Sequence, residues 1–158
     1  MTATIAQDHF TTELFDILEE TFETHHGIFL DKGTSLFETL AQIDAAEASR
    51  PVGGRCATLA AQVAHVTFYL EVLERYIDTG QTGQVDWGAI WRGVGAVSVE
   101  EWGALVANLK QTYARLKDQL RARESWDDDR PIGGALAIVV HSAYHLGEIR
   151  QALCTLKG

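Results

Sequence analysis

The sequence has very little proline, very little cysteine and too few basic side chains to balance its acidic ones. It has 2 prolines among 158 residues, and because proline breaks the hydrogen-bond ladder of a helix, their scarcity favours long helices. The 2 cysteines, Cys56 and Cys154, form no CxxC pair, so nothing indicates a redox dithiol or a thiolate metal site. Unpaired cysteines fit a reducing compartment, and we expect free thiols in a cytoplasmic protein.

Positive charge is also scarce, because 13 basic residues stand against 22 acidic ones, for a net charge of -9. This balance repels phosphate groups and anionic lipids, so neither nucleic acid nor a membrane is an expected partner. The densest basic stretch, residues 110–123, is interpreted as a solvated helix face. The longest apolar run, residues 132–140, falls short of the roughly 20 residues that a membrane span needs, and the N-terminus lacks the pattern of a signal peptide.

The remaining composition is that of an ordinary globular chain, with 46% hydrophobic and 22% charged residues. We expect one domain, residues 1–158, with a core large enough to fold without disulfides. Apolar residues recur at helical period, and capping residues mark several helix starts. The expected helices cover about residues 5–25, 36–43, 59–78, 98–124 and 131–156, with a loop over residues 45–54. The expected caps are Thr4, Ser35, Thr58 and Ser98, and Pro131 suits the first turn of the last helix.

The connection over residues 79–97 is longer than most loops between packed helices. Its length permits a crossover to a non-adjacent helix. It carries Trp87 and Trp91, interpreted as a small hydrophobic cluster at the end of the fold, with a cover over a pocket mouth as the alternative. We therefore expect an all-α fold, a four-helix bundle with a crossover between helices 2 and 3 and a short extra helix.

Histidines carry the clearest chemical signal. His141 and His145 are four residues apart, which places both imidazoles on one face of the last helix. The stripe that they share is small and apolar, so it is expected to face inward, where imidazoles need polar partners. A metal ion is one such partner and hydrogen bonds within the core are the other, and the HxxxH spacing alone does not separate the two.

The position of His65 favours a metal ion over hydrogen bonds within the core as the partner of these imidazoles. This histidine lies well inside a long predicted helix, on a stripe with Ala61, Phe68 and Val72 that also faces the core. Three inward-facing imidazoles from two helices match the way in which helical bundles hold metal ions. With nitrogen ligands alone and positions left open, the divalent ion is expected to be zinc or nickel, with iron or copper as alternatives.

Glu148 lies on the same stripe as His141. It is a candidate catalytic base, a group that orients an imidazole, a fourth ligand or a salt-bridge partner, and orienting or structural roles are favoured over direct ligation. Three tyrosines are further candidates for proton transfer: Tyr69, Tyr76 and Tyr144. Three histidines lie at helix ends or among polar residues and are not expected to be ligands: His9, His25 and His26.

The segment HSAYHLGEIRQ, residues 141–151, resembles the C-terminal helix motif of the DinB/YfiT-like superfamily of metalloenzymes. TSLFETL at residues 34–40 and TLAAQVAH at residues 58–65 resemble earlier landmarks of that family. The pairs at residues 86–87 and 101–102 are similar to the aromatic spacing of one branch, so the resemblance covers about residues 10–156. It implies a four-helix bundle with a crossover, often a homodimer, and a metal ion held by His65, His141 and His145.

The same resemblance implies metal-dependent transfer or isomerisation with low-molecular-weight thiols such as bacillithiol or mycothiol, or hydrolysis. The expected function is therefore that of a metal-dependent enzyme, an S-transferase or hydrolase, which activates a thiol or a water against a small-molecule substrate. One alternative is a non-catalytic, stress-related metal-binding protein. Another is a helical bundle whose histidines are purely structural.

The last helix also suggests self-association. It is apolar on every side between residues 132 and 146, with Val139, Ala143 and Leu146 opposite the histidine stripe. A helix that is apolar all round is either central or covered by another chain. We therefore expect a homodimer that uses this helix or its neighbours.

Overall fold

The structure, a computed structural model, describes residues 4–54, 56–81 and 83–158. Over these residues it is all-helical, which confirms the predicted all-α class. In chain order the helices are α1 (Gln7–Phe22), α2 (Leu36–Leu40), α3 (Ala45–Ala48), α4 (Leu59–Thr79), α5 (Ala89–Gly93), α6 (Val99–Arg121) and α7 (Asp129–Lys157).

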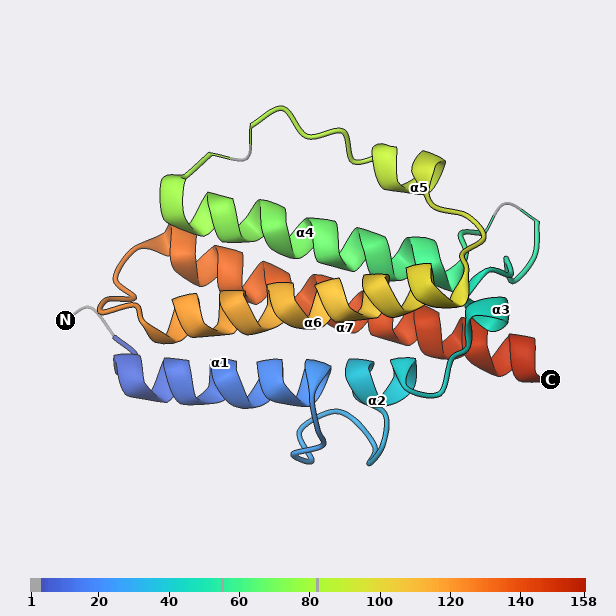
Figure 1. Ribbon diagram of the computed structural model, residues 1–158. Helices are drawn as coiled ribbons and strands as arrows, with labels where there is room; N and C mark the ends of the chain where they lie inside the picture. The colour runs from blue at the N-terminus through green and yellow to red at the C-terminus, as the bar shows by residue number, and fades with distance from the viewer. Residues whose placement is uncertain (1–3, 55, 82) are drawn as a thin grey trace.

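Four long helices, α1, α4, α6 and α7, lie with their axes roughly aligned (Figure 1). α4 packs against both α6 and α7, and α7 also packs against α1. Figure 1 shows the chain leaving α4 at one end, passing along the outside of α4 through α5, and entering α6 at the opposite end. α4 and α6 therefore run in one direction, and α1 and α7 run in the other.

Apolar residues from all four long helices share one continuous core. Leu18 of α1, Leu70 of α4, Leu109 of α6 and Ile138 of α7 are each 0% exposed. Burial of such side chains is the main stabilising contribution, about 1.5–3 kcal/mol for each. This core fixes the position of α4 relative to α7, the two helices that carry the candidate metal ligands.

Three of the four predicted helix caps are confirmed. The side chains of Ser35, Thr58 and Ser98 each accept a backbone hydrogen bond at a helix start, and Ser35 and Ser98 belong to complete capping boxes. The prediction for Thr4 is wrong, because α1 begins after Ala6 without any side-chain cap.

The side chain of Gln7, expected to complete that first capping box, has a different role. Its Oε1 accepts a hydrogen bond from the backbone N–H of Trp126 at 3.1 Å, and its Nε2 donates to the carbonyl of Glu124 at 3.3 Å. These contacts attach the start of α1 to the segment that leads into α7, so a tertiary contact replaces the local cap.

Two short helices lie where the sequence analysis predicts irregular chain. The predicted loop over residues 45–54 begins instead with α3, which has a complete capping box formed by Asp44 and Glu47. The long connection contains α5, which has no side-chain cap and no buried residue. The Asp44–Glu47 spacing was therefore a usable signal for α3, whereas α5 has no comparable signal.

A buried carboxylate holds the turn after α1. Glu20 is 0% exposed, and its oxygens accept the backbone N–H groups of Ile28, Phe29 and Leu30 at 2.8, 3.0 and 2.7 Å. Burial alone would raise the pKa of Glu20, but these donors lower it below its ordinary value. The chain can therefore leave the helix at Phe22, somewhat before the predicted end near residue 25.

α7 is the longest helix, and its outward face differs from the predicted one. Three large apolar side chains face solvent with exposures of 48%, 68% and 61%: Leu136, Val140 and Tyr144. The prediction that Val139, Ala143 and Leu146 form the outer face is wrong, because Leu146 is 1% exposed and the other two are half-buried. α7 packs on both α4 and α1, so a wide arc of its surface is covered.

Among the described residues, α7 alone is long and apolar enough to cross a membrane by length and composition. Core helices of soluble proteins meet the same criterion, and 39% of its most apolar window is buried inside the structure. The buried side carries Ile138, His145 and Ile149, so α7 is a core element of this fold.

Candidate metal centre

The structure brings together the three histidines that the sequence singles out. His65 comes from α4, and His141 and His145 come from α7, which packs directly on α4. One nitrogen from each ring lies within 4.8 Å of the corresponding nitrogens of the other two. The ring centroids are 5.0 Å apart for His65 and His141, 4.8 Å for His65 and His145, and 4.4 Å for His141 and His145.

Burial separates these rings from bulk water. His65 is 7% exposed and His145 is 5% exposed, while His141 is half-buried. Within the described part of the chain, Nδ1 of His65 and Nε2 of His141 are buried and have no hydrogen-bond partner. An unsatisfied buried polar atom costs about 1–3 kcal/mol, so two of them in one cluster indicate that the cluster fits a ligand that accepts nitrogen lone pairs.

The protonation of the cluster suits such a ligand. Burial, aided by repulsion from His145, lowers the pKa of His65 to about 4, although Glu148 opposes the shift. Burial and the neighbouring imidazoles lower the pKa of His141 to about 3. Burial also lowers the pKa of His145, against the opposing effect of Glu148. Near neutral pH all three rings are therefore uncharged, the form in which an imidazole binds a metal ion.

His145 differs from the other two rings because one of its nitrogens is already engaged. Its Nδ1 lies 2.6 Å from Oε1 of Gln62 and 2.9 Å from Oε2 of Glu148. Both neighbours are acceptors, so Nδ1 carries the proton and Nε2 is left with a free lone pair. A carboxylate that fixes the tautomer of a ligating histidine in this way is a recurrent partner in metal sites.

Glu148 is itself held in place. The hydroxyl of Tyr144 donates a hydrogen bond to Oε1 of Glu148 at 2.7 Å, while the other carboxylate oxygen faces His145. That bond and the charge of Glu148 raise the pKa of the Tyr144 hydroxyl, so it remains a donor at neutral pH. Glu148 thus contacts Nδ1 of His145, the ring nitrogen that also faces Gln62.

Gln62 is a site residue that sequence reasoning missed. It lies three residues before His65 on α4, so one helical turn places both side chains on the same face. That spacing was the available signal, but glutamine has no distinctive metal chemistry and is common on helix surfaces. Only the packing of α4 on α7 brings it to His145.

Aromatic rings surround the cluster on the side of α5. Tyr69 stacks on His141 with ring centroids 3.5 Å apart, and Trp91 packs against His65 in a tilted arrangement with ring centroids 4.3 Å apart. Trp87 packs edge-on against Phe68 at 5.9 Å. Trp91 thus lies against His65, with its ring centroid 6.3 Å from that of His145, and Trp87 packs on Phe68 and Tyr69. The roles of these tryptophans as a hydrophobic cluster or as a cover over a pocket both stay predictions.

The remaining candidates from the sequence lie apart from this cluster. Tyr76 lies next to Gly134, about two helical turns before His141 on α7. Three histidines are exposed, as expected, and one of them, His26, lies 3.7 Å from a carboxylate oxygen of Glu19. These three are His9, His25 and His26.

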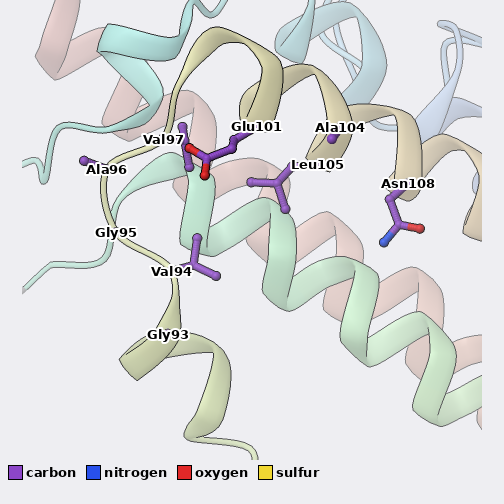
Figure 2. Close-up of a pocket in the computed structure, with 9 residues that line it drawn as sticks. All are labelled: Gly93, Val94, Gly95, Ala96, Val97, Glu101, Ala104, Leu105 and Asn108. Atoms are coloured by element: carbon purple, nitrogen blue, oxygen red, sulfur yellow. The ribbon is translucent and has the colours of Figure 1, made fainter.

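A groove of about 450 Å³ lies between α6 and residues 93–97. Figure 2 shows Val94 and Leu105 on opposite sides of it, with Asn108 further along α6. The carboxylate that lines this groove belongs to Glu101. It accepts a hydrogen bond from the backbone N–H of Ser98 at 2.7 Å and is thus part of the capping box of α6. The groove offers no set of convergent ligands among its described residues, so the three-histidine cluster is the better candidate site.

Comparisons of the chain with family models, curated proteins and solved structures give no match. The resemblance of its last helix to the DinB/YfiT-like motif therefore stays a prediction, and the case for the site depends on the geometry above.

Proposed function

We propose that this chain binds one divalent metal ion through His65, His141 and His145, and that its helices form a DinB/YfiT-like four-helix bundle. Zinc or nickel is the preferred ion, with iron or copper as alternatives. The observation that supports this most directly is the pair of buried, unpartnered nitrogens on His65 and His141. Three neutral imidazoles without a thiolate match the donor preference of these ions.

Three protein ligands leave a coordination position open, which is typical of catalytic rather than structural zinc sites. A bound ion supplies Lewis-acid chemistry, which lowers the pKa of a thiol or a water. We therefore propose a metal-dependent transferase or hydrolase that acts on a small molecule, with a low-molecular-weight thiol as the candidate cosubstrate.

The chain's own residues have defined tasks in this proposal. Glu148 and Gln62 keep the proton on Nδ1 of His145, so that Nε2 keeps a lone pair free for the ion. Glu148 also connects that imidazole to the exposed hydroxyl of Tyr144, which provides a route for protons between the site and solvent. Trp91 limits the access of water to His65 by covering its ring.

A second candidate function is non-catalytic metal binding, as in a sensor or store. The specific observation that favours it is the restricted access to the cluster: His65 and His145 are 7% and 5% exposed, and Trp91 packs against the ring of His65. A substrate would have to displace or pass these rings, whereas an ion alone needs far less space.

The experiment is a metal analysis of purified wild type, His145→Ala and His9→Ala after matched reconstitution with zinc and with nickel. His9 is exposed and lies outside the cluster, so its variant controls for loss of an ordinary histidine. We expect near one equivalent of metal in wild type and His9→Ala and sharply less in His145→Ala. Equal metal contents in all three proteins, or no binding in any, would overturn the proposed site.

Turnover separates the two candidate functions once binding is established. Zinc-loaded wild type and His145→Ala would be assayed with a panel of low-molecular-weight thiols and electrophiles, and with ester and amide substrates. Turnover that disappears in His145→Ala supports the enzyme. A saturable metal site without turnover on any member of the panel supports the sensor or store.

A further inference from the structure

A separate cavity of about 580 Å³ lies beside the groups that contact Nδ1 of His145, and the start of α4, α7 and the residues Val52, Cys56 and Ala57 line it. Its size falls within the range usual for small-molecule sites. Gln62, Tyr144 and Glu148 line it, and these are the residues that hold His145 and its carboxylate. The cavity is therefore bounded by groups that contact Nδ1 of His145, and none of the three histidines is among its described lining residues.

The one charged group among the described residues of this cavity, the carboxylate of Glu148, is an acceptor with unused capacity. Each carboxylate oxygen of Glu148 receives one hydrogen bond, from Tyr144 and from His145, and a carboxylate can accept about four in total. Gln62 and Gln151 add two carboxamides, each with an acceptor oxygen and an NH2 donor, and the oxygen of Gln62 already contacts Nδ1 of His145. The described lining residues include no lysine, arginine or histidine, and the chain as a whole carries a net charge of -9. The cavity is thus suited to a cation that donates several hydrogen bonds.

The rest of the lining is largely apolar, and most of that surface is aliphatic. Val52, Leu59 and Ala152 offer aliphatic surface, and no aromatic face other than the ring of Tyr144 lines the cavity. Gly147 of α7 also lines it, and a Cβ placed there would meet no atom within 4 Å, so the space beside Gly147 is open. An occupant with a short alkyl chain fits this surface, since apolar contact favours an aliphatic body behind a charged head.

We propose that this cavity is a binding site for a small primary aliphatic amine, whose ammonium group is held by Glu148 and the two carboxamides. An ammonium has three donors and no acceptor, and the carboxylate of Glu148 and the carboxamide oxygens of Gln62 and Gln151 are acceptors in this lining. Charge-assisted hydrogen bonds of this kind are about twice as strong as neutral ones. Because Glu148 also accepts from His145, occupancy of the cavity and the state of the metal centre are thermodynamically linked.

The amine site does not require the metal, so it is tested on metal-free protein in the presence of a chelator. The probes are n-pentylamine, pentan-1-ol and pentanoate, which share chain length and differ in charge. Binding is followed at pH 7 by two-dimensional NMR titration of the labelled protein. We expect saturable shifts centred on Gln62, Gln151 and Gly147, and dissociation constants about 5-fold or more lower for the amine than for the alcohol or the carboxylate.

Two variants locate the site and identify the charge. Gly147→Leu fills the cavity without removing a hydrogen bond, and should weaken amine binding about 5-fold or more, a loss expected from excluding an alkyl chain. Gly133→Leu is the matched control, because it lies on the same helix, outside the cavity, and also has open space for a side chain. Glu148→Gln should bring the amine close to the alcohol in affinity, whereas Glu100→Gln, on the exposed start of α6, should not.

Equal affinity for the three probes in wild type would overturn the proposal, as would amine binding that survives Gly147→Leu unchanged. Failure of the metal analysis alone leaves these results intact, because they are measured without metal. Conversely, a protein that binds the metal ion normally but shows no preference for the amine would overturn the amine site and leave the proposed metal-dependent function standing.

Discussion

The indole of Trp91 packs against the imidazole of His65 in a tilted arrangement, with ring centroids 4.3 Å apart and an interplanar angle of 30°. Trp91 is 39% exposed and belongs to α5, which buries no residue of its own. This contact therefore places a fluorescent side chain beside the candidate metal centre.

An open-shell ion bound by the histidines should quench Trp91, because such ions deactivate an excited indole at short range. We expect nickel to reduce the tryptophan fluorescence of wild type in a saturable way and zinc to reverse the effect by competition. Trp91→Phe should lose most of the nickel-dependent change. Trp87→Phe, which removes a neighbouring indole that packs on Phe68 rather than on an imidazole, should retain most of it. Quenching that is the same in both variants would argue against metal at His65.

A second prediction concerns the acid stability of the turn after α1. Because the folded-state pKa of Glu20 lies below the ordinary value of 4.5, the unfolded chain takes up its proton first. Its contribution to stability is fully present above that ordinary value and is lost as pH falls through the folded-state pKa.

Near pH 7, the free energy of unfolding of Glu20→Gln should therefore be about 2 kcal/mol or more below that of wild type, because the substitution replaces a charged hydrogen-bond acceptor by a neutral one. The variant should accordingly unfold at a lower urea concentration. The difference between the two proteins should shrink as pH is lowered below about 4.5, the ordinary pKa of a glutamate side chain. Urea denaturation at several pH values measures it. A difference that stays constant across that range would show that the charge of Glu20 does not stabilise the turn.

The sequence predicted most of the helices because their signals are local. Capping residues such as Ser35, Thr58 and Ser98 interact within one turn of the chain, and these three predictions are confirmed. Thr4 had the right spacing too, but a contact between Gln7 and the distant Trp126 decided the start of α1. Tertiary contacts of this kind leave no pattern within a short stretch of sequence.

The residues of the candidate site also fall into two groups, those that local sequence predicts and those that depend on how the helices pack. His141 and His145 share a helical face by spacing alone, and the apolar stripe around His65 correctly indicated burial. Gln62 and the position of Trp91 beside His65 depend on how α4, α5 and α7 meet, which one helix cannot specify. The outer face of α7 was misassigned for a related reason, because the number of neighbours around a helix cannot be read from its own composition.

A third prediction concerns self-association through that outer face. Leu136, Val140 and Tyr144 are four residues apart in succession, so they form one exposed apolar stripe along α7. We predict a homodimer in which this stripe is covered by a second copy, and light scattering at micromolar concentration should give twice the mass of one chain. Val140→Lys should shift the protein to monomer, because it places a charge within the contact. Val99→Lys, at an equally exposed valine on α6, should not.

A monomeric wild type at that concentration would contradict this prediction, and so would a dimer that both variants leave intact. The dissociation constant of wild type and of each variant is obtained by repeating the measurement over a range of protein concentrations.

The last prediction distinguishes the two acceptors at Nδ1 of His145. Glu148 is charged and Gln62 is neutral, so the carboxylate is the stronger acceptor although Gln62 is the closer one, at 2.6 Å against 2.9 Å. Removing an outer partner of a ligating histidine weakens metal binding about 10- to 100-fold. The loss of zinc affinity in Glu148→Leu should therefore fall in that range, and the loss in Gln62→Leu should be smaller. Both affinities are measured by competition with a chelating indicator. Tyr144→Phe, which removes a donor only from the other carboxylate oxygen, should stay close to wild type. If Gln62→Leu instead proves the more damaging change, the amide rather than the carboxylate orients His145, and Glu148 serves chiefly the cavity that it lines.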